Sequence, residues 1–135
     1  RKLKGIVIDD SAAEITGRWQ VSTANQKFVD SGYRHNGKQE IGSKQAVYRT
    51  KLKPGRYEVR ISYPPNDNRA SNVPVTIRHA DGVAELKLNQ RKKPSHGGLF
   101  ESVGTLRFED AAVVTIGTAE TDGYVVIDAV QFLNR

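Results

Sequence analysis

The chain has 135 residues, a formal net charge of +6 and no cysteine. This length fits one domain with a core that needs neither metal nor disulfides, and the missing cysteines exclude disulfides, zinc–thiolate sites and cysteine nucleophiles. No window approaches the roughly 20 apolar residues of a membrane-spanning helix. The positive charge favours an acidic partner, for which an anionic glycan, a nucleic acid and a lipid surface are the alternatives.

Apolar and polar residues alternate along most of the chain, as in strands with one packed face. The alternation is clearest where Tyr57, Val59 and Ile61 share one face. No segment has the apolar spacing of an amphipathic helix. In chain order, nine strands are predicted over residues 5–9, 17–22, 46–52, 55–63, 73–79, 84–89, 101–109, 112–118 and 124–133. The expected fold is all-β, an antiparallel β-sandwich of the jelly-roll type formed by residues 1–135.

The connections between these strands differ in length. Short turns are expected at Pro54-Gly55, Asp81-Gly82 and Asp110-Ala111, whereas residues 24–45, 64–72, 91–100 and 119–123 form longer connections. If successive strands run antiparallel, the long connections gather at one end of the sandwich. Binding residues usually lie on loops held by a rigid scaffold, so this end is the expected binding surface.

Catalytic motifs are not apparent. His35, His79 and His96 lack the spacing of a zinc site, and His79 is in phase with a strand, as expected of a hydrogen-bonded histidine at a strand end. No nucleotide-binding loop or nucleophile elbow is present. Neighbouring carboxylates such as Asp9-Asp10 point apart in an extended chain, so a glycosidase pair is only a minor alternative. The sequence predicts a non-enzymatic protein.

Asp128 is the most informative acidic residue. It lies in a segment that is apolar on both faces, YVVIDAVQF, so its carboxylate is expected to be buried. A buried carboxylate must be hydrogen-bonded, paired or bound to a metal. We expect it to accept bonds from backbone N–H groups or an arginine, with a structural calcium ion shared with Asp9 or Asp10 as the alternative.

Two aromatic residues have two interpretations each. Trp19 alternates with Val21 and is expected in the core, with a sugar-stacking platform as the alternative. Tyr33 lies in the polar stretch DSGYRHNG, where it either is exposed or folds its own loop down. The basic cluster Arg91-Lys92-Lys93 is either a solvated loop or a contact for a phosphate or sulfate group.

Taken in order, the motifs resemble the golvesin C-terminal-like domain, also described as the xanthan lyase carbohydrate-binding-like domain, a bacterial accessory module. The resemblance covers nearly the whole chain and is most specific in NRASNVPVTIRHADG followed by GYVVIDAVQF. The matching segments are TGRWQVST at 16–23, GYRHNG at 32–37, PGRYEVRISY at 54–63, NRASNVPVTIRHADG at 68–82, LNQ at 88–90, SVGTLRFE at 102–109 and DGYVVIDAVQFL at 122–133.

The resemblance implies a non-catalytic β-sandwich that binds a polysaccharide or oligosaccharide and serves a catalytic domain in the same chain. Because the chain begins at Arg1 and contains no methionine, we expect a piece of a longer protein. The resemblance implies that this protein is secreted, at the cell surface or in the periplasm. The alternative is a structural or interaction domain that packs against its parent enzyme without a glycan site. Neither a membrane nor a nucleic acid is expected as a partner, and no cofactor is expected apart from the calcium ion.

Under this resemblance the loop at residues 64–72 is expected to contact the ligand. Amide and guanidinium groups suit sugar hydroxyls and acidic groups, and the flanking prolines lower the entropy lost on binding. A turn at Asp81-Gly82 would place Asn89 and Gln90 beside Pro74 and Val73, next to the same loop. The same loop residues would otherwise bind only one another. The candidate ligand-binding residues are Asn68, Arg69, Asn72, Tyr33, His35, Asn89, Gln90 and Arg91.

Overall fold

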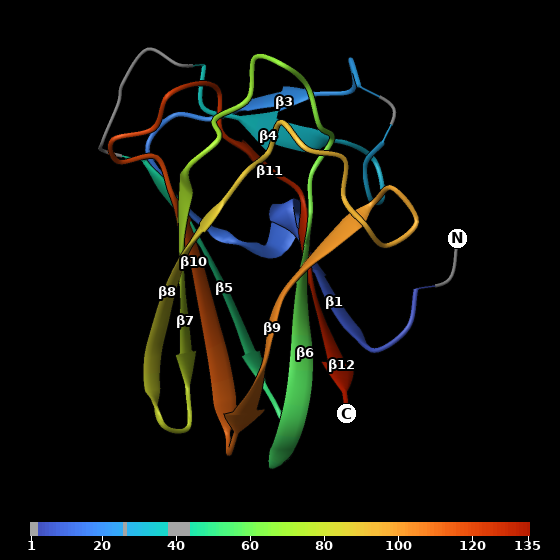
Figure 1. Ribbon diagram of the computed structural model, residues 1–135, viewed down its shortest axis with the longest axis vertical. Helices are drawn as coiled ribbons and strands as arrows, with labels where there is room; N and C mark the ends of the chain where they lie inside the picture. Colours follow the sequence, from blue (N-terminus) through green and yellow to red (C-terminus); the bar gives the residue numbers. More distant parts are fainter. Residues whose placement is uncertain (1–2, 26, 38–43) are drawn as a thin grey trace.

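Figure 1 shows the computed structural model of the protein, which describes residues 3–25, 27–37 and 44–135. Two antiparallel sheets pack face to face, and a small third sheet lies across one end. The first sheet has the order β1 (Ile6–Asp9), β12 (Ala129–Asn134), β6 (Gly55–Ser62), β9 (Phe100–Phe108). The second has the order β2 (Glu14–Thr16), β5 (Gln45–Lys51), β10 (Ala111–Gly117), β7 (Val73–His79), β8 (Gly82–Leu88). The third has the order β11 (Val126–Ile127), β4 (Tyr33–His35), β3 (Gln20–Ser22).

The predicted all-β, antiparallel sandwich is confirmed, while the jelly-roll description stays a prediction. The described part of the chain contains twelve strands rather than about nine. Strands β2 and β4 were not predicted because three residues are too few to show a period of two. The predicted strand at 124–133 is two strands, β11 and β12, which part at Asp128. A short 3-10 helix, η1 (Asp10–Ala12), follows β1, and no described helix is long and apolar enough to cross a bilayer.

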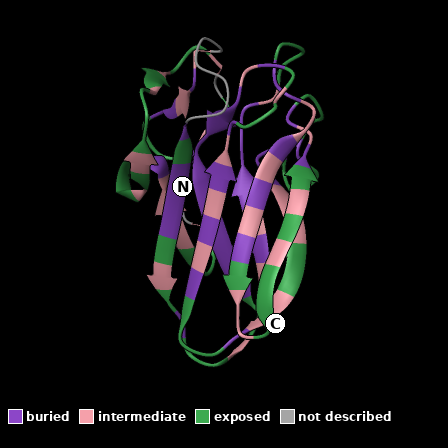
Figure 2. Ribbon diagram, turned by 90° about the vertical axis from the view of Figure 1, so that its left-hand side faces the viewer, coloured by how far each residue is buried: buried purple, intermediate pink, exposed green. Residues whose placement is uncertain are grey.

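The core lies between the two large sheets. Buried and more exposed residues alternate along the strands, as the period of two predicts (Figure 2). The rings of Tyr57, Phe108 and Phe132 meet edge to face, with centroids 5.9 and 6.0 Å apart. Burial of each such side chain stabilises the fold by roughly 2–3 kcal/mol. This rigid core is what holds the loops at each end.

The two ends of the sandwich differ, as the lengths of the connections predict. The short turns after β5, β7 and β9 lie at one end, at the bottom of Figure 1. The third sheet and residues 64–72 and 119–123 lie at the other end, which we call the loop pole. Polar connections from distant parts of the sequence therefore meet at one surface.

The register of the β7–β8 hairpin corrects one prediction. His79 pairs with Gly82 and Val73 with Leu88, so the turn is made by Ala80 and Asp81 instead of Asp81-Gly82. The backbone N–H of Asp81 donates to Nδ1 of His79, which closes the turn one residue early. As a result, Asn89 and Gln90 extend past the end of the hairpin and do not lie beside Pro74 and Val73.

Candidate functional site: a cavity at the loop pole

A cavity of about 570 Å³ opens at the loop pole, between the third sheet and residues 64–72. We call it the loop-pole cavity. Most of its wall is polar or aromatic, which is the usual chemistry of a site for a hydroxyl-rich ligand. The wall contains the rings of Tyr33, His35 and Tyr124, the amides of Asn25, Asn66 and Asn68, and the guanidinium of Arg69.

Strand β4 supplies two of these rings because alternate residues of a strand share one face. Tyr33 and His35 both line the cavity. Arg34, between them, instead pairs with the carboxylate of Asp10, its Nε lying 2.8 Å from Oδ2. The same three residues thus connect the cavity to the beginning of η1.

Tyr33 folds its own loop down, one of its two predicted roles. Its side chain is buried, with its ring centroid 6.2 Å from that of Phe28. Its hydroxyl accepts hydrogen bonds from the backbone N–H of Asn25 and the hydroxyl of Ser22, both at 3.3 Å. The ring is therefore not an exposed platform, although the residue forms part of the cavity wall.

Arg69 is less accessible than the sequence led us to expect. Only 6% of the residue is exposed. Its Nε donates to the carbonyl of Pro64 at 3.1 Å, one terminal nitrogen donates to Asn68 Oδ1 at 2.9 Å, and its guanidinium carbon lies 5.7 Å from the centre of the Tyr33 ring. Arg69 thus stiffens the loop and lines the cavity from within, while Asn68 is exposed beside it.

Tyr124 is brought to the cavity by a close contact between two backbones. The N–H of Ala70 donates to the carbonyl of Tyr124, and the N–H of Tyr124 donates to the carbonyl of Asn68. The contact needs a glycine at 123, since a Cβ there would lie 2.7 Å from the carbonyl oxygen of Arg69. The ring of Tyr124 then meets His35 edge to face, with centroids 5.9 Å apart.

The surroundings of His35 favour its neutral form. Burial lowers the pKa of this histidine, and the positive charges of Arg69 and Lys44 lower it further. Its Nδ1 accepts a hydrogen bond from the N–H of Gly37 at 3.1 Å, which assigns the ring proton to Nε2. The neutral ring offers one hydrogen-bond donor and an aromatic face.

Three further predicted residues hold loops together. The amide of Asn72 donates to the carbonyl of Glu120 at 3.0 Å and accepts from the N–H of Asp122 at 3.1 Å. Arg91 donates to the carbonyl of Arg69 at 2.7 Å and pairs with Asp122. Asn89 caps the backbone N–H of Arg91. None of the three is in the cavity wall.

Gln90 was expected in the ligand patch, and its placement is a correction. Its side chain is fully buried. The amide nitrogen donates to the carbonyl of Val126 at 2.8 Å, and the amide oxygen accepts from the N–H of Val126 at 2.9 Å. The glutamine therefore takes the place of a neighbouring strand for β11. A polar residue one position past a strand end was interpreted as exposed, but the hairpin ends earlier than predicted and Gln90 turns inward.

Among the described residues that line the cavity, none carries a carboxylate. The pair of carboxylic acids that glycoside hydrolysis requires is therefore not present in that part of the wall. The rings, amides and guanidinium favour stacking and hydrogen bonding over general acid–base chemistry. Trp19 does not belong to the site, because it is partly buried against the main core and its indole N–H donates to the carbonyl of Thr16.

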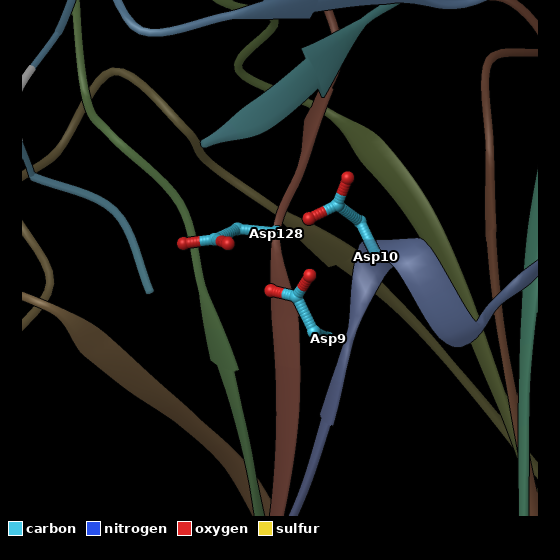
Figure 3. A group of neighbouring side chains, drawn as sticks. All are labelled: Asp9, Asp10 and Asp128. Carbon is cyan, nitrogen blue, oxygen red and sulfur yellow. The ribbon is translucent and has the colours of Figure 1, made fainter. Parts of the chain in front are cut away.

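A second polar group lies deeper in the molecule, where β1 ends and β11 meets β12. Asp128 is fully buried, as predicted, and accepts a hydrogen bond from the N–H of Val29 at 2.7 Å. Asp9 and Asp10 lie beside it, each offering a carboxylate oxygen within 4.8 Å of the others (Figure 3). Oxygen atoms in this number and spacing could hold a cation.

Five residues of the cavity wall were missed by the sequence analysis: Ser22, Ala24, Asn25, Asn66 and Tyr124. Asn66 lies in the loop that was predicted to bind, where only Asn68 and Asn72 were selected among the asparagines. Tyr124 begins a strand-like apolar run, so it was counted as part of the strand. Its position directly after Asp122-Gly123, a turn-like pair, was the available signal for an aromatic residue at a loop edge.

Comparison with known proteins supports one family. The family model described as the golvesin C-terminal domain matches residues 6–134. The chain is 33% identical over 141 aligned positions to xanthan lyase from Bacillus sp. (strain GL1), which covers 98% of this chain and 15% of that protein. The structure of Paenibacillus xanthan lyase superposes on 96% of this chain with a TM-score of 0.88 at 29% identity, and the match spans 13% of the lyase.

More distant structures share the fold. The mannan binding module from Man5C matches 96% of this chain and 98% of its own length, with a TM-score of 0.61 at 10% identity. The Podospora anserina GH26-CBM35 mannanase matches 96% of this chain and 27% of its own, with a TM-score of 0.69 at 16% identity. At these identities the similarity concerns the fold alone. The chain thus spans a small part of the curated lyase but the full length of an isolated binding module.

Proposed function

The chain belongs to the golvesin C-terminal domain family, and from this premise we propose that it is a non-catalytic carbohydrate-binding module. Its ligand is an acidic polysaccharide, bound at the loop-pole cavity. It serves a catalytic domain in the same chain of a secreted or cell-surface protein. The observation that carries the proposal is the composition of the cavity wall: three aromatic rings and three amides around one guanidinium.

The wall has the two kinds of group that sugar recognition needs. Ring faces pack against the C–H faces of a sugar, and amides donate to and accept from its hydroxyls. Asn66 and Asn68 are exposed, whereas Tyr33 and Arg69 behind them are held by several hydrogen bonds. A wall fixed before binding loses little entropy when a ligand enters.

The preference for an acidic ligand rests on charge. The whole chain carries +6, and the described wall of the cavity contains Arg69 without a carboxylate to neutralise it. A uronate or another acidic substituent would accept hydrogen bonds from the exposed amides, while the positive charge of Arg69 behind them attracts it. Because the cavity is open to water, this contribution should weaken as salt is added.

The alternative, an interaction domain without a glycan site, has less support. Such a domain would present a continuous apolar surface to its partner. The exposed large hydrophobic residues of the described chain are Ile6, Val21 and Val83, which belong to three different sheets. Single exposed apolar residues of this kind are ordinary.

Affinity electrophoresis in gels that contain neutral or acidic polysaccharides tests the proposal. We expect retention by at least one acidic polysaccharide and weaker retention at higher salt. Tyr124→Ala and Asn68→Ala should lower the affinity by roughly tenfold, since each removes a stacking or hydrogen-bonding contact worth about 1–2 kcal/mol.

Arg78→Ala is the matched control. Arg78 is exposed on β7 toward the other end of the sandwich, so its loss changes the charge of the protein without touching the cavity. No retention on any neutral or acidic glycan would overturn the proposal. Equal losses for Tyr124→Ala and Arg78→Ala would remove the cavity as the site.

A further inference from the structure

The cluster of Asp9, Asp10 and Asp128 is unusual because only one of the two oxygens of each carboxylate has a hydrogen-bond partner. One oxygen of Asp9 accepts from the N–H and hydroxyl of Ser11, and one oxygen of Asp10 accepts from Arg34. The remaining oxygen of each carboxylate, and that of Asp128, is buried without a hydrogen-bond partner. Buried polar atoms without partners are rare and each needs an explanation.

Two of the three unpartnered oxygens belong to side chains that are themselves removed from water. Asp10 is 5% exposed and Asp128 is fully buried. The three carboxylates come from β1, η1 and the junction of β11 with β12, and they gather in one space in Figure 3. The protein thus fixes one oxygen of each group by a hydrogen bond and leaves the other oxygen without one.

The charges of the cluster do not balance. Three carboxylates carry three negative charges, and Arg34 is the cation bonded to them among the described residues. The remainder of two negative charges equals the charge of one divalent cation.

We propose that Asp9, Asp10 and Asp128 bind one calcium ion through their unpartnered oxygens. The set contains oxygen ligands alone, which calcium prefers, whereas zinc prefers nitrogen and sulfur ligands. Calcium accepts irregular shells of six to eight ligands at about 2.3–2.6 Å. Oxygens that share such an ion can be as much as about 5 Å apart, and one carboxylate oxygen from each of the three residues lies within 4.8 Å of the others.

A route from solvent reaches the cluster. A cavity of about 510 Å³ is lined by Asp9 together with Val7, Val29 and Asp30. Water from this side can complete the shell of the ion, and Asp30 adds a negative charge at the entrance. Asp9 is the partly exposed member of the cluster, which makes it the entry ligand.

The ion would join three parts of the fold that are far apart in sequence. Asp9 ends β1, Asp10 begins η1, and Asp128 lies between the two last strands. Val29 is bonded to Asp128, and Arg34 on β4 is bonded to Asp10. The proposed ion therefore fixes both ends of residues 29–34, directly beneath the loop-pole cavity.

Calcium binding to the purified chain tests this inference without any glycan. The protein is freed of metal with a chelator, and calcium chloride is added in a calorimeter at neutral pH. We expect one site per chain and a melting temperature about 5–10 °C higher at saturating calcium. Asp9→Asn and Asp128→Asn should each weaken calcium binding at least about tenfold, because each removes a charged ligand.

Two controls keep the result interpretable. Asp9 also caps η1 through Ser11, and asparagine is an equally good cap, so Asp9→Asn decides the question if Asp128→Asn does not fold. Asp110→Asn removes a carboxylate from the exposed turn before β10 and should leave calcium binding unchanged. No heat and no change in melting temperature, or equal losses in the Asp9 and Asp110 variants, would refute the site. Equal affinity for magnesium would refute its assignment to calcium.

Discussion

The loop-pole cavity and the carboxylate cluster beneath it differ in whether their polar atoms have hydrogen-bond partners. Around the cavity, side chains such as Asn72 and Arg91 are bonded to neighbouring loops, and the exposed amides face water. In the cluster, carboxylate oxygens are both buried and unpartnered. A carboxylate on the outer face of the first sheet, Glu58, shows that this chain can pair its acids fully, since Arg60 and Arg135 both donate to it.

The difference separates two kinds of site. A cavity wall whose inner side chains are hydrogen-bonded to the protein and whose outer side chains face water suits a ligand that binds reversibly. Buried oxygens without partners suit an ion that stays, because its removal would leave a desolvated charge. The following predictions test this distinction, in order of decreasing effect.

The largest effect is expected for Gln90→Ala. The variant leaves the N–H and carbonyl of Val126 without partners in the interior, which should lower the free energy of unfolding by about 3 kcal/mol. Urea denaturation measures this loss. Glycan affinity per folded molecule should change less than about threefold, since Gln90 does not line the cavity. Asn89→Ala is the control and should cost under about 1 kcal/mol; a loss of binding without a loss of stability would return Gln90 to the ligand site.

Gly123→Ala should cost about 2 kcal/mol and weaken glycan binding as well. The added Cβ would press on the carbonyl of Arg69 and displace Tyr124 from the cavity wall. Gly117→Ala is the matched substitution, because its Cβ would meet Pro74 at an ordinary contact distance of 3.6 Å. Denaturant unfolding and the polysaccharide gels measure both effects. Similar results for the two glycines would show that the close approach at 123 is unimportant.

A smaller, pH-dependent effect on the free energy of unfolding is expected for Glu58. Hydrogen bonds from Arg60 and Arg135 lower the pKa of this carboxyl to about 2 in the folded protein, from 4.5. Its contribution to stability is therefore present above pH 4.5 and is lost as the pH falls toward 2. The free energy of unfolding should drop by about 1–2 kcal/mol more in the wild type than in Glu58→Gln between pH 6 and pH 3. Parallel pH profiles of the two proteins would contradict the pairing.

The smallest expected effect is that of calcium removal on glycan affinity. Removal of calcium with a chelator should weaken glycan binding by about threefold, since Arg34 lies between Tyr33 and His35 on β4 and is bonded to Asp10. Calorimetric titration with the retained polysaccharide, with and without chelator, measures this. The Asp9→Asn variant should bind glycan weakly and show no response to the chelator. An unchanged affinity would mean that the cavity and the cluster are independent.

The sequence predicted the sandwich well because its long strands carry a clear period of two. The same rule explains the burial of Asp128, which has apolar neighbours on both faces of its segment. It failed where a strand has only three residues, as in β4, and where a turn could form at either of two adjacent positions. The turn at Ala80-Asp81 is an example. It lies one residue earlier than predicted, which moves Asn89 and Gln90 away from the predicted patch.

The site was harder to predict because its members come from distant parts of the chain. Asn25, Asn68 and Tyr124 meet only after three separate loops are folded. Whether an asparagine faces a ligand or a neighbouring carbonyl depends on those contacts, and Asn68 and Asn72 differ in this respect although they lie in one loop. Asp10 was an alternative to Asp9 in the sequence, whereas the fold brings both to Asp128.

The short turns at the end opposite the cavity have a practical consequence. Residues such as Asp110 are solvent-accessible there and remote from the proposed sugar contacts. Since the chain has no native cysteine, a single one introduced at this position would accept a fluorophore or a surface linker without competing thiols. The module could then be immobilised in one orientation, with its recognition end presented to polymers in solution.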